Sequence, residues 1–137
     1  TFSDVTDAYA AVVDLFVGAD IIEGYPDNTF RGESGITRAE FVKILSIMLD
    51  VKEENKATFN DISGHWCEKY INSFAALKLL NGYPDGNFKP DNVITRAEVI
   101  AVLNRITQND NSEDAAYFKD MDESHWAYRD VCKVIIR

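Results

Sequence analysis

The sequence predicts an all-α protein built from tandem helix-loop-helix repeats. Residues 24–40 and 82–98 share ten of seventeen positions without a gap, at an offset of 58 residues, so the chain contains an internal duplication. Each block ends in Thr-Arg-Ala-Glu, which fits the capping box of a helix start. Apolar residues then recur at helical spacing. The pattern predicts helices near residues 7–22, 37–50, 65–80, 95–108 and 124–136, with only short strand-like pieces in the loops.

A second marker, Phe-x-Asp followed by an apolar residue, sets the repeat boundaries. It begins at Phe2, Phe59 and Phe118, and the last two copies lead into His-Trp pairs at 65–66 and 125–126. We therefore divide a single module of residues 1–137 into repeat 1 (1–57), repeat 2 (58–116) and a partial repeat 3 (117–137). Because the sequence starts inside a motif, without a signal peptide, we expect it to be part of a longer protein.

The loops between the two helices of a repeat contain strong turn chemistry. Gly24 and Gly82 follow the first helices and are expected to end them in the left-handed conformation. In Pro-Asp-Gly-Asn at 84–87, proline presets φ and Gly86 can take a positive φ. Asn28 occupies the same place in repeat 1, as the next most tolerant residue. Thr37 and Thr95 then cap the second helices, with Glu40 and Glu98 reaching back to them.

Composition excludes several classes of protein. The net charge of −9 argues against a nucleic-acid binder, which needs a clustered basic face. No apolar run is long enough to span a bilayer, so no membrane insertion is expected. Cys67 and Cys132 are too few for a disulfide framework or a zinc knuckle, and we expect buried free thiols.

No catalytic or metal-binding motif is present. The Asp-x-Asn-containing loop resembles a calcium loop, but Lys89 and Arg96 stand where calcium ligands are required, as do Arg31 and Arg38 in repeat 1. Fingerprints of hydrolases, zinc enzymes and nucleotide-binding proteins are absent from the sequence. We therefore expect no enzyme activity, no cofactor and no metal.

The arginines of the two Thr-Arg-Ala-Glu blocks are the strongest candidate binding residues. A cation at the first helical position is disfavoured by the helix dipole, so Arg38 and Arg96 need a partner elsewhere. That partner is either an acidic side chain of the protein or an anionic ligand held by arginine and free helix amides. From the residues alone the two alternatives are equally balanced.

The repeated aromatic residues are also open to two interpretations. Trp66 and Trp126 pack into a core, or present a ring to a sugar at a groove. Tyr25 and Tyr83 pack likewise, or place a hydroxyl at a groove rim. The histidines before the tryptophans have no second ligand at metal spacing.

Phe-x-Asp-Val, His-Trp, Gly-Tyr-Pro-Asp-Gly-x-Phe-x-Pro and Ile-Thr-Arg-Ala-Glu together resemble the S-layer homology repeat over essentially the whole chain. The resemblance implies an extracellular, cell-wall-bound module in which three repeats form a pseudo-threefold helical bundle. It implies that inter-repeat grooves bind an anionic secondary cell-wall polysaccharide bearing a pyruvate-ketal amino sugar. The arginines map onto the ligand-binding cation, which favours the ligand alternative and predicts accessible guanidinium groups. The candidate site comprises Arg38, Arg96, Thr37, Thr95, Glu40, Glu98, Trp66, Trp126, Tyr25 and Tyr83.

The sequence departs from the family pattern in ways that affect the assembly. Repeat 1 has Asp7-Ala8 in place of His-Trp and Gly32 in place of Pro90, and repeat 3 lacks its second half. We expect the helix after His125 to pack on the first two repeats with Trp126 buried, and an apolar surface to remain that a homodimer could cover. The alternative functions are a protein-protein docking module without sugar specificity and an accessory domain of a surface hydrolase.

Overall fold

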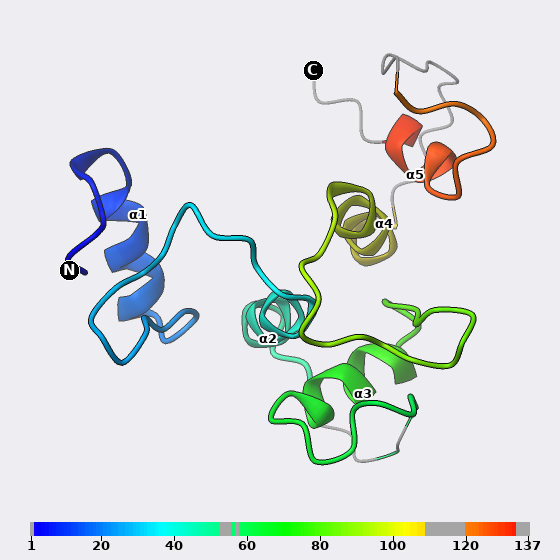
Figure 1. The fold of residues 1–137 in the computed structure, drawn as a ribbon, viewed down its shortest axis with the longest axis horizontal. Coiled ribbons are helices and arrows are strands. Elements are labelled where there is room, and N and C mark those ends of the chain that lie inside the picture. Colours follow the sequence, from blue (N-terminus) through cyan, green and yellow to red (C-terminus); the bar gives the residue numbers. More distant parts are fainter. Residues whose placement is uncertain (1, 53–55, 57, 109–119, 134–137) are drawn as a thin grey trace.

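The computed structural model describes residues 2–52, 56, 58–108 and 120–133, and it is helical as predicted (Figure 1). The helices are α1 (Asp7–Gly18), α2 (Arg38–Met48), α3 (Glu68–Ala76), α4 (Arg96–Thr107) and α5 (Tyr128–Lys133). Within these residues the extended segments form a single isolated bridge, between Thr37 and Val93. The all-α prediction is confirmed, with α1, α2, α3 and α4 shorter than expected and α5 beginning later than expected.

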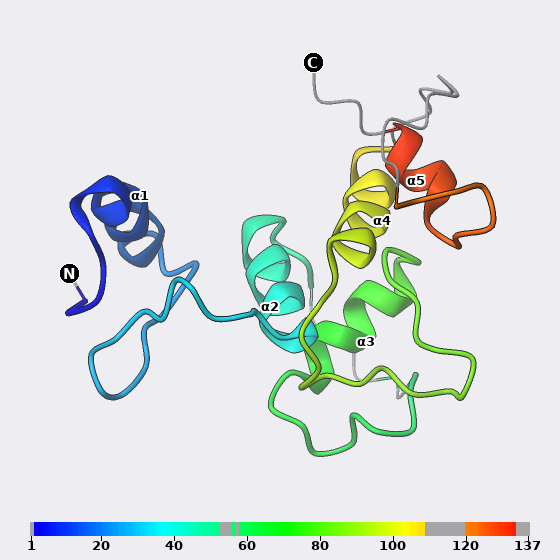
Figure 2. The same cartoon turned by 45° about the horizontal axis from the view of Figure 1, so that its top comes forward.

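The helices pack in pairs that combine two successive repeats. α3, the first helix of repeat 2, packs on α2, the second helix of repeat 1, and α5 packs on α4 in the same way. α1 makes no comparable contact with another described helix, and it stands apart from the others in Figures 1 and 2. A packing unit of this fold is therefore half of one repeat joined to half of the next.

The main hydrophobic core lies between α2 and α3. Ala39, Val42 and Leu45 of α2 cover Ile71 and Phe74 of α3. Ile71 and Phe74 are completely buried, and burial of each such side chain stabilises the fold by about 1.5–3 kcal/mol. Ile62, Cys67, Leu80 and Phe88 complete the cluster from the loops that flank α3.

Helix α5 confirms only part of the expectation for repeat 3. It packs on α4 and buries Val131, and the Asn104 side chain donates to the backbone oxygen of Asp130 at 2.6 Å. The predicted burial of Trp126 is wrong, because its side chain is 61% exposed. The predicted end of this helix, at 134–136, lies outside the described residues.

The His-Trp segments are turns that precede the helices. The Nδ1 atom of His65 accepts from the Cys67 amide at 3.1 Å, and the Gly64 amide donates to the Glu68 carboxylate at 2.8 Å. These contacts delay the start of α3 to Glu68 and direct Cys67 inward and Trp66 outward. The Cys67 thiol, whose pKa burial raises to about 12, and the half-buried Cys132 are both free.

The role expected of Gly24 and Gly82 as left-handed helix ends is wrong. Asp20 (φ 55°) and Lys78 (φ 58°) take the left-handed conformation after α1 and α3. Gly24 and Gly82 instead allow close approach of the Phe-x-Asp segment, because a Cβ atom would overlap the rings of Phe2 and Phe59 respectively. The glycines are thus required by packing rather than by φ.

The Asp of each Phe-x-Asp marker ties the start of the repeat to its central loop. The Asp61 carboxylate accepts from the amides of Phe88 and Lys89 at 2.8 and 2.7 Å. Asp4 makes the same pair of contacts in repeat 1. The turns themselves are as predicted, with positive φ at Asn28 (61°) and Gly86 (81°).

Both capping boxes are present, which leads to a first prediction. Thr95 accepts from the Glu98 amide, and the Glu98 carboxylate accepts from the Thr95 amide at 2.8 Å. Thr95→Ala is expected to lower the free energy of unfolding by about 0.5–2 kcal/mol, measured by urea titration. Thr6→Ala is the matched control, since Thr6 precedes α1 without making a side-chain cap. Equal effects of the two changes would contradict the capping role.

Candidate functional site

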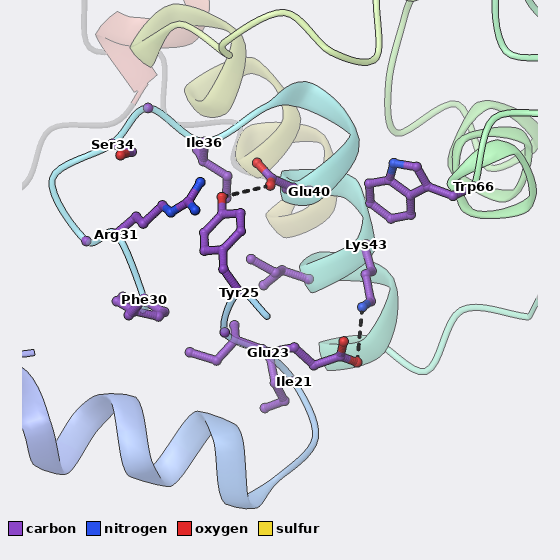
Figure 3. Close-up of a pocket in the computed structure, with 15 residues that line it drawn as sticks. Ile21, Glu23, Tyr25, Phe30, Arg31, Ser34, Ile36, Glu40, Lys43 and Trp66 are labelled. Atoms are coloured by element: carbon purple, nitrogen blue, oxygen red, sulfur yellow. Dashed lines mark hydrogen bonds and ion pairs between the residues drawn. The ribbon is translucent and has the colours of Figure 1, made fainter. Parts of the chain in front are cut away.

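A groove between the two repeats, which we name groove 1, has a volume of about 490 Å³. Figure 3 shows Tyr25 and Arg31 on the loop of repeat 1, Lys43 on α2 and Trp66 entering from repeat 2. The Trp66 side chain is 56% exposed although it is large and apolar. The size and mixed lining of groove 1 are typical of a small-molecule or sugar site. The residues that line groove 1 are Ile21, Ile22, Glu23, Gly24, Tyr25, Phe30, Arg31, Gly32, Ser34, Gly35, Ile36, Glu40, Lys43, Ile44 and Trp66.

Two cations of groove 1 are balanced by exposed carboxylates. The Arg31 guanidinium lies 4.0 Å from the centre of the Tyr25 ring and pairs with Asp27 at 2.8 Å. A hydrogen bond from Thr29 and the pairing with Arg31 lower the pKa of Asp27 to about 2. Lys43 pairs with Glu23, 78% exposed, at 3.3 Å. Exposed pairs of this kind are weak, so an incoming anion can replace the carboxylates at low cost.

A second groove, groove 2, repeats this arrangement 58 residues later with a volume of about 610 Å³. Gly82, Tyr83, Phe88, Ile94 and Glu98 occupy the places of their counterparts in groove 1, and the exposed Trp126 takes the place of Trp66. The cations differ: Ala101 replaces Lys43, and Arg105 lines groove 2 from the next turn of α4. Its lining residues are Arg38, Phe41, Val42, Leu80, Asn81, Gly82, Tyr83, Pro84, Phe88, Ile94, Thr95, Glu98, Ala101, Val102, Arg105 and Trp126.

The predicted exposure of Arg38 is wrong. Arg38 is only 6% exposed, and its guanidinium forms an ion pair with Glu98 at 2.7 Å. It also donates to the backbone oxygens of Phe88 at 2.8 Å and Asn81 at 3.3 Å, and its guanidinium carbon lies 4.9 Å from the centre of the Tyr83 ring. Of the two alternatives left open by the sequence, the structure places an acidic side chain of the next repeat against this arginine.

The surroundings of the Glu98 carboxylate, which pairs with Arg38, keep it ionised. Partial burial raises the pKa of Glu98, but hydrogen bonds from Thr95 and Tyr83 and the charge of Arg38 outweigh burial and lower it below its usual value. Tyr83 donates to the same carboxylate oxygen at 2.6 Å. Burial and this hydrogen bond raise the pKa of Tyr83, so the hydroxyl keeps its proton at neutral pH.

The other candidate residues are distributed over the grooves and caps. Tyr25, Glu40 and Trp66 line groove 1, whereas Tyr83, Thr95, Glu98 and Trp126 line groove 2. Thr37 caps α2 and lines neither groove. Arg96 is exposed as predicted, but it also lies outside both grooves.

Three basic residues that line the grooves, together with Lys89 beside the Tyr83 ring, were not singled out as ligand candidates from the sequence. Arg31 and Lys89 follow the phenylalanine of each repeat block, so their repetition was a usable signal. Both form i,i+4 ion pairs, to Asp27 and Asp85, in the loop compared with a calcium site. Lys43 and Arg105 occupy non-equivalent positions, so the duplication alone could not identify them.

The described residues contain no group of three or more acidic, histidine or cysteine side chains arranged to hold a metal ion. None of the helices in the described residues is both long enough and apolar enough to cross a membrane.

The profile of the S-layer homology domain matches this chain twice, at residues 1–42 and 58–100. The chain belongs to the S-layer homology domain family. Each match falls within one of the two full copies predicted from the internal duplication. The family assignment made from the repeat motifs is thus confirmed, whereas the threefold arrangement of three repeats remains a prediction.

Relatives of this S-layer homology module are surface proteins and enzymes. The cellulosome-anchoring protein of Acetivibrio thermocellus is 34% identical over 99% of this chain and 32% of its own length. Cell surface glycoprotein 1 of the same organism is 34% identical over 95% of this chain and 6% of its own length. The amylopullulanase of Thermoanaerobacterium thermosulfurigenes is 31% identical over 93% of this chain and 7% of its own length.

This chain therefore spans about a third or less of the relatives it matches. The family and these relatives indicate a cell-surface or cell-wall location, as predicted. They also support a non-catalytic anchoring module, since the relatives that are enzymes are far longer than this chain.

Proposed function

We propose that this module attaches a protein to the bacterial cell wall by binding an anionic wall polysaccharide, with groove 1 as the main site. The observation that carries the proposal is the position of Trp66, a largely exposed ring at the edge of a groove that also holds Arg31 and Lys43. An aromatic face suits the apolar face of a sugar ring, and the two cations suit a carboxylate.

A pyruvate-ketal amino sugar fits this lining. Its carboxylate would displace Glu23 from Lys43, or Asp27 from Arg31, because both pairs are exposed. Groove 2 is a weaker site in this proposal. Glu98 neutralises Arg38 within it, and Ala101 stands where groove 1 has Lys43.

Binding to purified cell-wall sacculi tests the proposal. Trp66→Ala is expected to weaken binding about tenfold or more, as loss of a central aromatic contact does. Lys43→Ala is expected to weaken it about fivefold and to reduce its salt dependence. Chemical removal of the pyruvate ketals from the sacculi should abolish the difference between wild type and Lys43→Ala.

The matched controls are Leu77→Ala and Lys52→Ala. Leu77 is 56% exposed, as Trp66 is, and Lys52 is exposed, and both lie outside the grooves. Unchanged binding of Trp66→Ala together with Lys43→Ala would rule out groove 1. Full binding to ketal-free sacculi would rule out the pyruvylated sugar while leaving the groove in place.

A further inference from the structure

The turn that carries Trp66 is closed by a hydrogen bond to the preceding histidine ring. The Cys67 amide donates to Nδ1 of His65 at 3.1 Å, so the contact joins the two residues on either side of Trp66. Cys67 is completely buried, and its thiol donates to the backbone oxygen of Ala39 at 3.2 Å. The inner end of the turn is therefore fixed in the core. Trp66 points into groove 1, and the centres of its ring and the His65 ring lie 5.3 Å apart.

The third repeat makes the same turn with a different residue at its inner end. The Ala127 amide donates to Nδ1 of His125 at 3.2 Å, and Ala127 is completely buried, as Cys67 is. The ring centres of His125 and Trp126 lie 5.8 Å apart, and Trp126 lines groove 2. Because the contact forms with either cysteine or alanine at the inner end, the histidine ring is the side chain that closes the turn.

This contact requires the neutral form of His65. A ring nitrogen that accepts from an amide carries no hydrogen, so the imidazole in this turn is protonated on Nε2 alone. Nε2 lies 3.2 Å from a carboxylate oxygen of Asp91, to which it donates. An imidazolium carries a hydrogen on both nitrogens. A proton on Nδ1 would face the hydrogen of the Cys67 amide and leave that buried amide without its acceptor.

The charged groups around His65 come from three elements. Asp91 belongs to the loop before α4, Glu68 of α3 accepts from the backbone amide of residue 64 at 2.8 Å, and Lys43 of α2 lines groove 1. The two carboxylates favour the imidazolium, and the ammonium group opposes it. The Asp91 side chain is 83% exposed, and ion pairs of such exposed groups contribute little. Loss of the acceptor of a buried amide costs more, so protonation opens the turn.

We propose that His65 is a positioning residue for wall binding, which holds Trp66 in the direction that groove 1 requires when the imidazole is neutral and releases it on protonation. The link to wall binding rests on the proposed function, whereas the coupling between the two side chains does not. Binding to the wall is then strongest at neutral pH. It weakens on acidification from about pH 8 to about pH 5, the range in which histidine takes up a proton.

Binding to purified sacculi at about pH 7.5 and about pH 5, at constant ionic strength, tests the role of the ring. Wild-type binding is expected to weaken about fivefold at the lower pH, within the roughly tenfold loss expected for Trp66→Ala. His65→Asn is the conservative variant, because an asparagine oxygen can accept from the amide two residues on but does not titrate. It should bind as wild type does at the higher pH and weaken less than about twofold at the lower pH.

Two further variants complete this experiment. His65→Ala provides no acceptor for the Cys67 amide, so it should bind weakly at both pH values. His125→Asn is the matched control in the other His-Trp turn, and it should keep the wild-type loss at low pH because groove 1 is the main site. A loss at low pH that persists in His65→Asn, or that disappears only in His125→Asn, would overturn the proposal.

Nuclear magnetic resonance of the free protein tests the coupling without the wall. The Cys67 amide and the Trp66 indole signals should shift with the same midpoint as the ring nitrogens of His65. Titration of His65 without a change in these signals overturns the proposal, whatever the sacculi show. Signals that move together while Trp66→Ala binds sacculi fully would support the coupling, but they would reject groove 1 and with it the role of His65 in wall binding.

Discussion

Replacement of Arg38 by alanine is expected to lower the free energy of unfolding by about 3–5 kcal/mol, as removal of one partner of a buried ion pair does. The change leaves the Glu98 carboxylate without its cation and the backbone oxygens of Phe88 and Asn81 without this donor. Unsatisfied buried polar groups cost more than the net worth of the bonds they made. Urea unfolding followed by circular dichroism measures the effect.

The matched control is Arg96→Ala, the same change at the same position of the other Thr-Arg-Ala-Glu block. Arg96 is exposed and has no ion pair with the described residues. We expect its unfolding free energy to stay within about 0.5 kcal/mol of wild type. A double-mutant cycle of Arg38→Ala with Glu98→Ala should give a coupling of at least about 1 kcal/mol. Equal stability of the Arg38 and Arg96 variants would contradict an inter-repeat structural role for Arg38.

Gly82→Ala is expected to destabilise the protein by about 1–3 kcal/mol or more, the usual range for overpacking. An added Cβ would overlap the Phe59 ring and lie 2.7 Å from the backbone oxygen of Asn87. The ring could move, but the oxygen belongs to the tight turn that closes through the Tyr83 amide at 2.8 Å. The turn and the Phe-x-Asp segment would therefore have to separate.

Gly18→Ala provides the opposite expectation for the same chemical change. Gly18 is the last residue of α1 and an added Cβ would meet nothing within 4 Å. Alanine there should stabilise the helix by up to about 1 kcal/mol. The two melting temperatures, measured by calorimetry, should move in opposite directions. A stabilised or unchanged Gly82→Ala protein would show that the turn tolerates a side chain.

The local features of the fold were predictable because they depend on neighbouring residues. The Thr95–Glu98 box and the positive φ of Gly86 each follow from chemistry within four residues. The inward direction of Cys67 and the outward direction of Trp66 depend on an equally local contact, in which the Cys67 amide donates to the His65 ring. A pattern of apolar residues alone could not distinguish the two sides of that turn.

The candidate site was predicted less well, because its key contacts join distant parts of the chain. The helix-dipole argument correctly required a partner for Arg38, but the partner is Glu98, sixty residues away. The sequence had predicted only a capping role for Glu98. In the structure one carboxylate oxygen of Glu98 accepts from the Thr95 amide and the other pairs with Arg38. Groove 1 combines Tyr25, Lys43 and Trp66 from three segments, and only a three-dimensional arrangement brings them together.

The pairing of α2 with α3 and of α4 with α5 has a consequence for how such proteins are synthesised and recombined. α2 ends at Met48 and its partner α3 ends at Ala76, so at about 5–20 residues per second the ribosome exposes the apolar face of α2 for seconds before it can be covered. Folding during translation thus proceeds across sequence-repeat boundaries. A recombination junction in the segment between α2 and α3 would join α2 to an α3 from another protein, and so change one side of the core. A junction in the loop between Gly82 and Thr95 would leave the α2–α3 pair and the α4–α5 pair each intact.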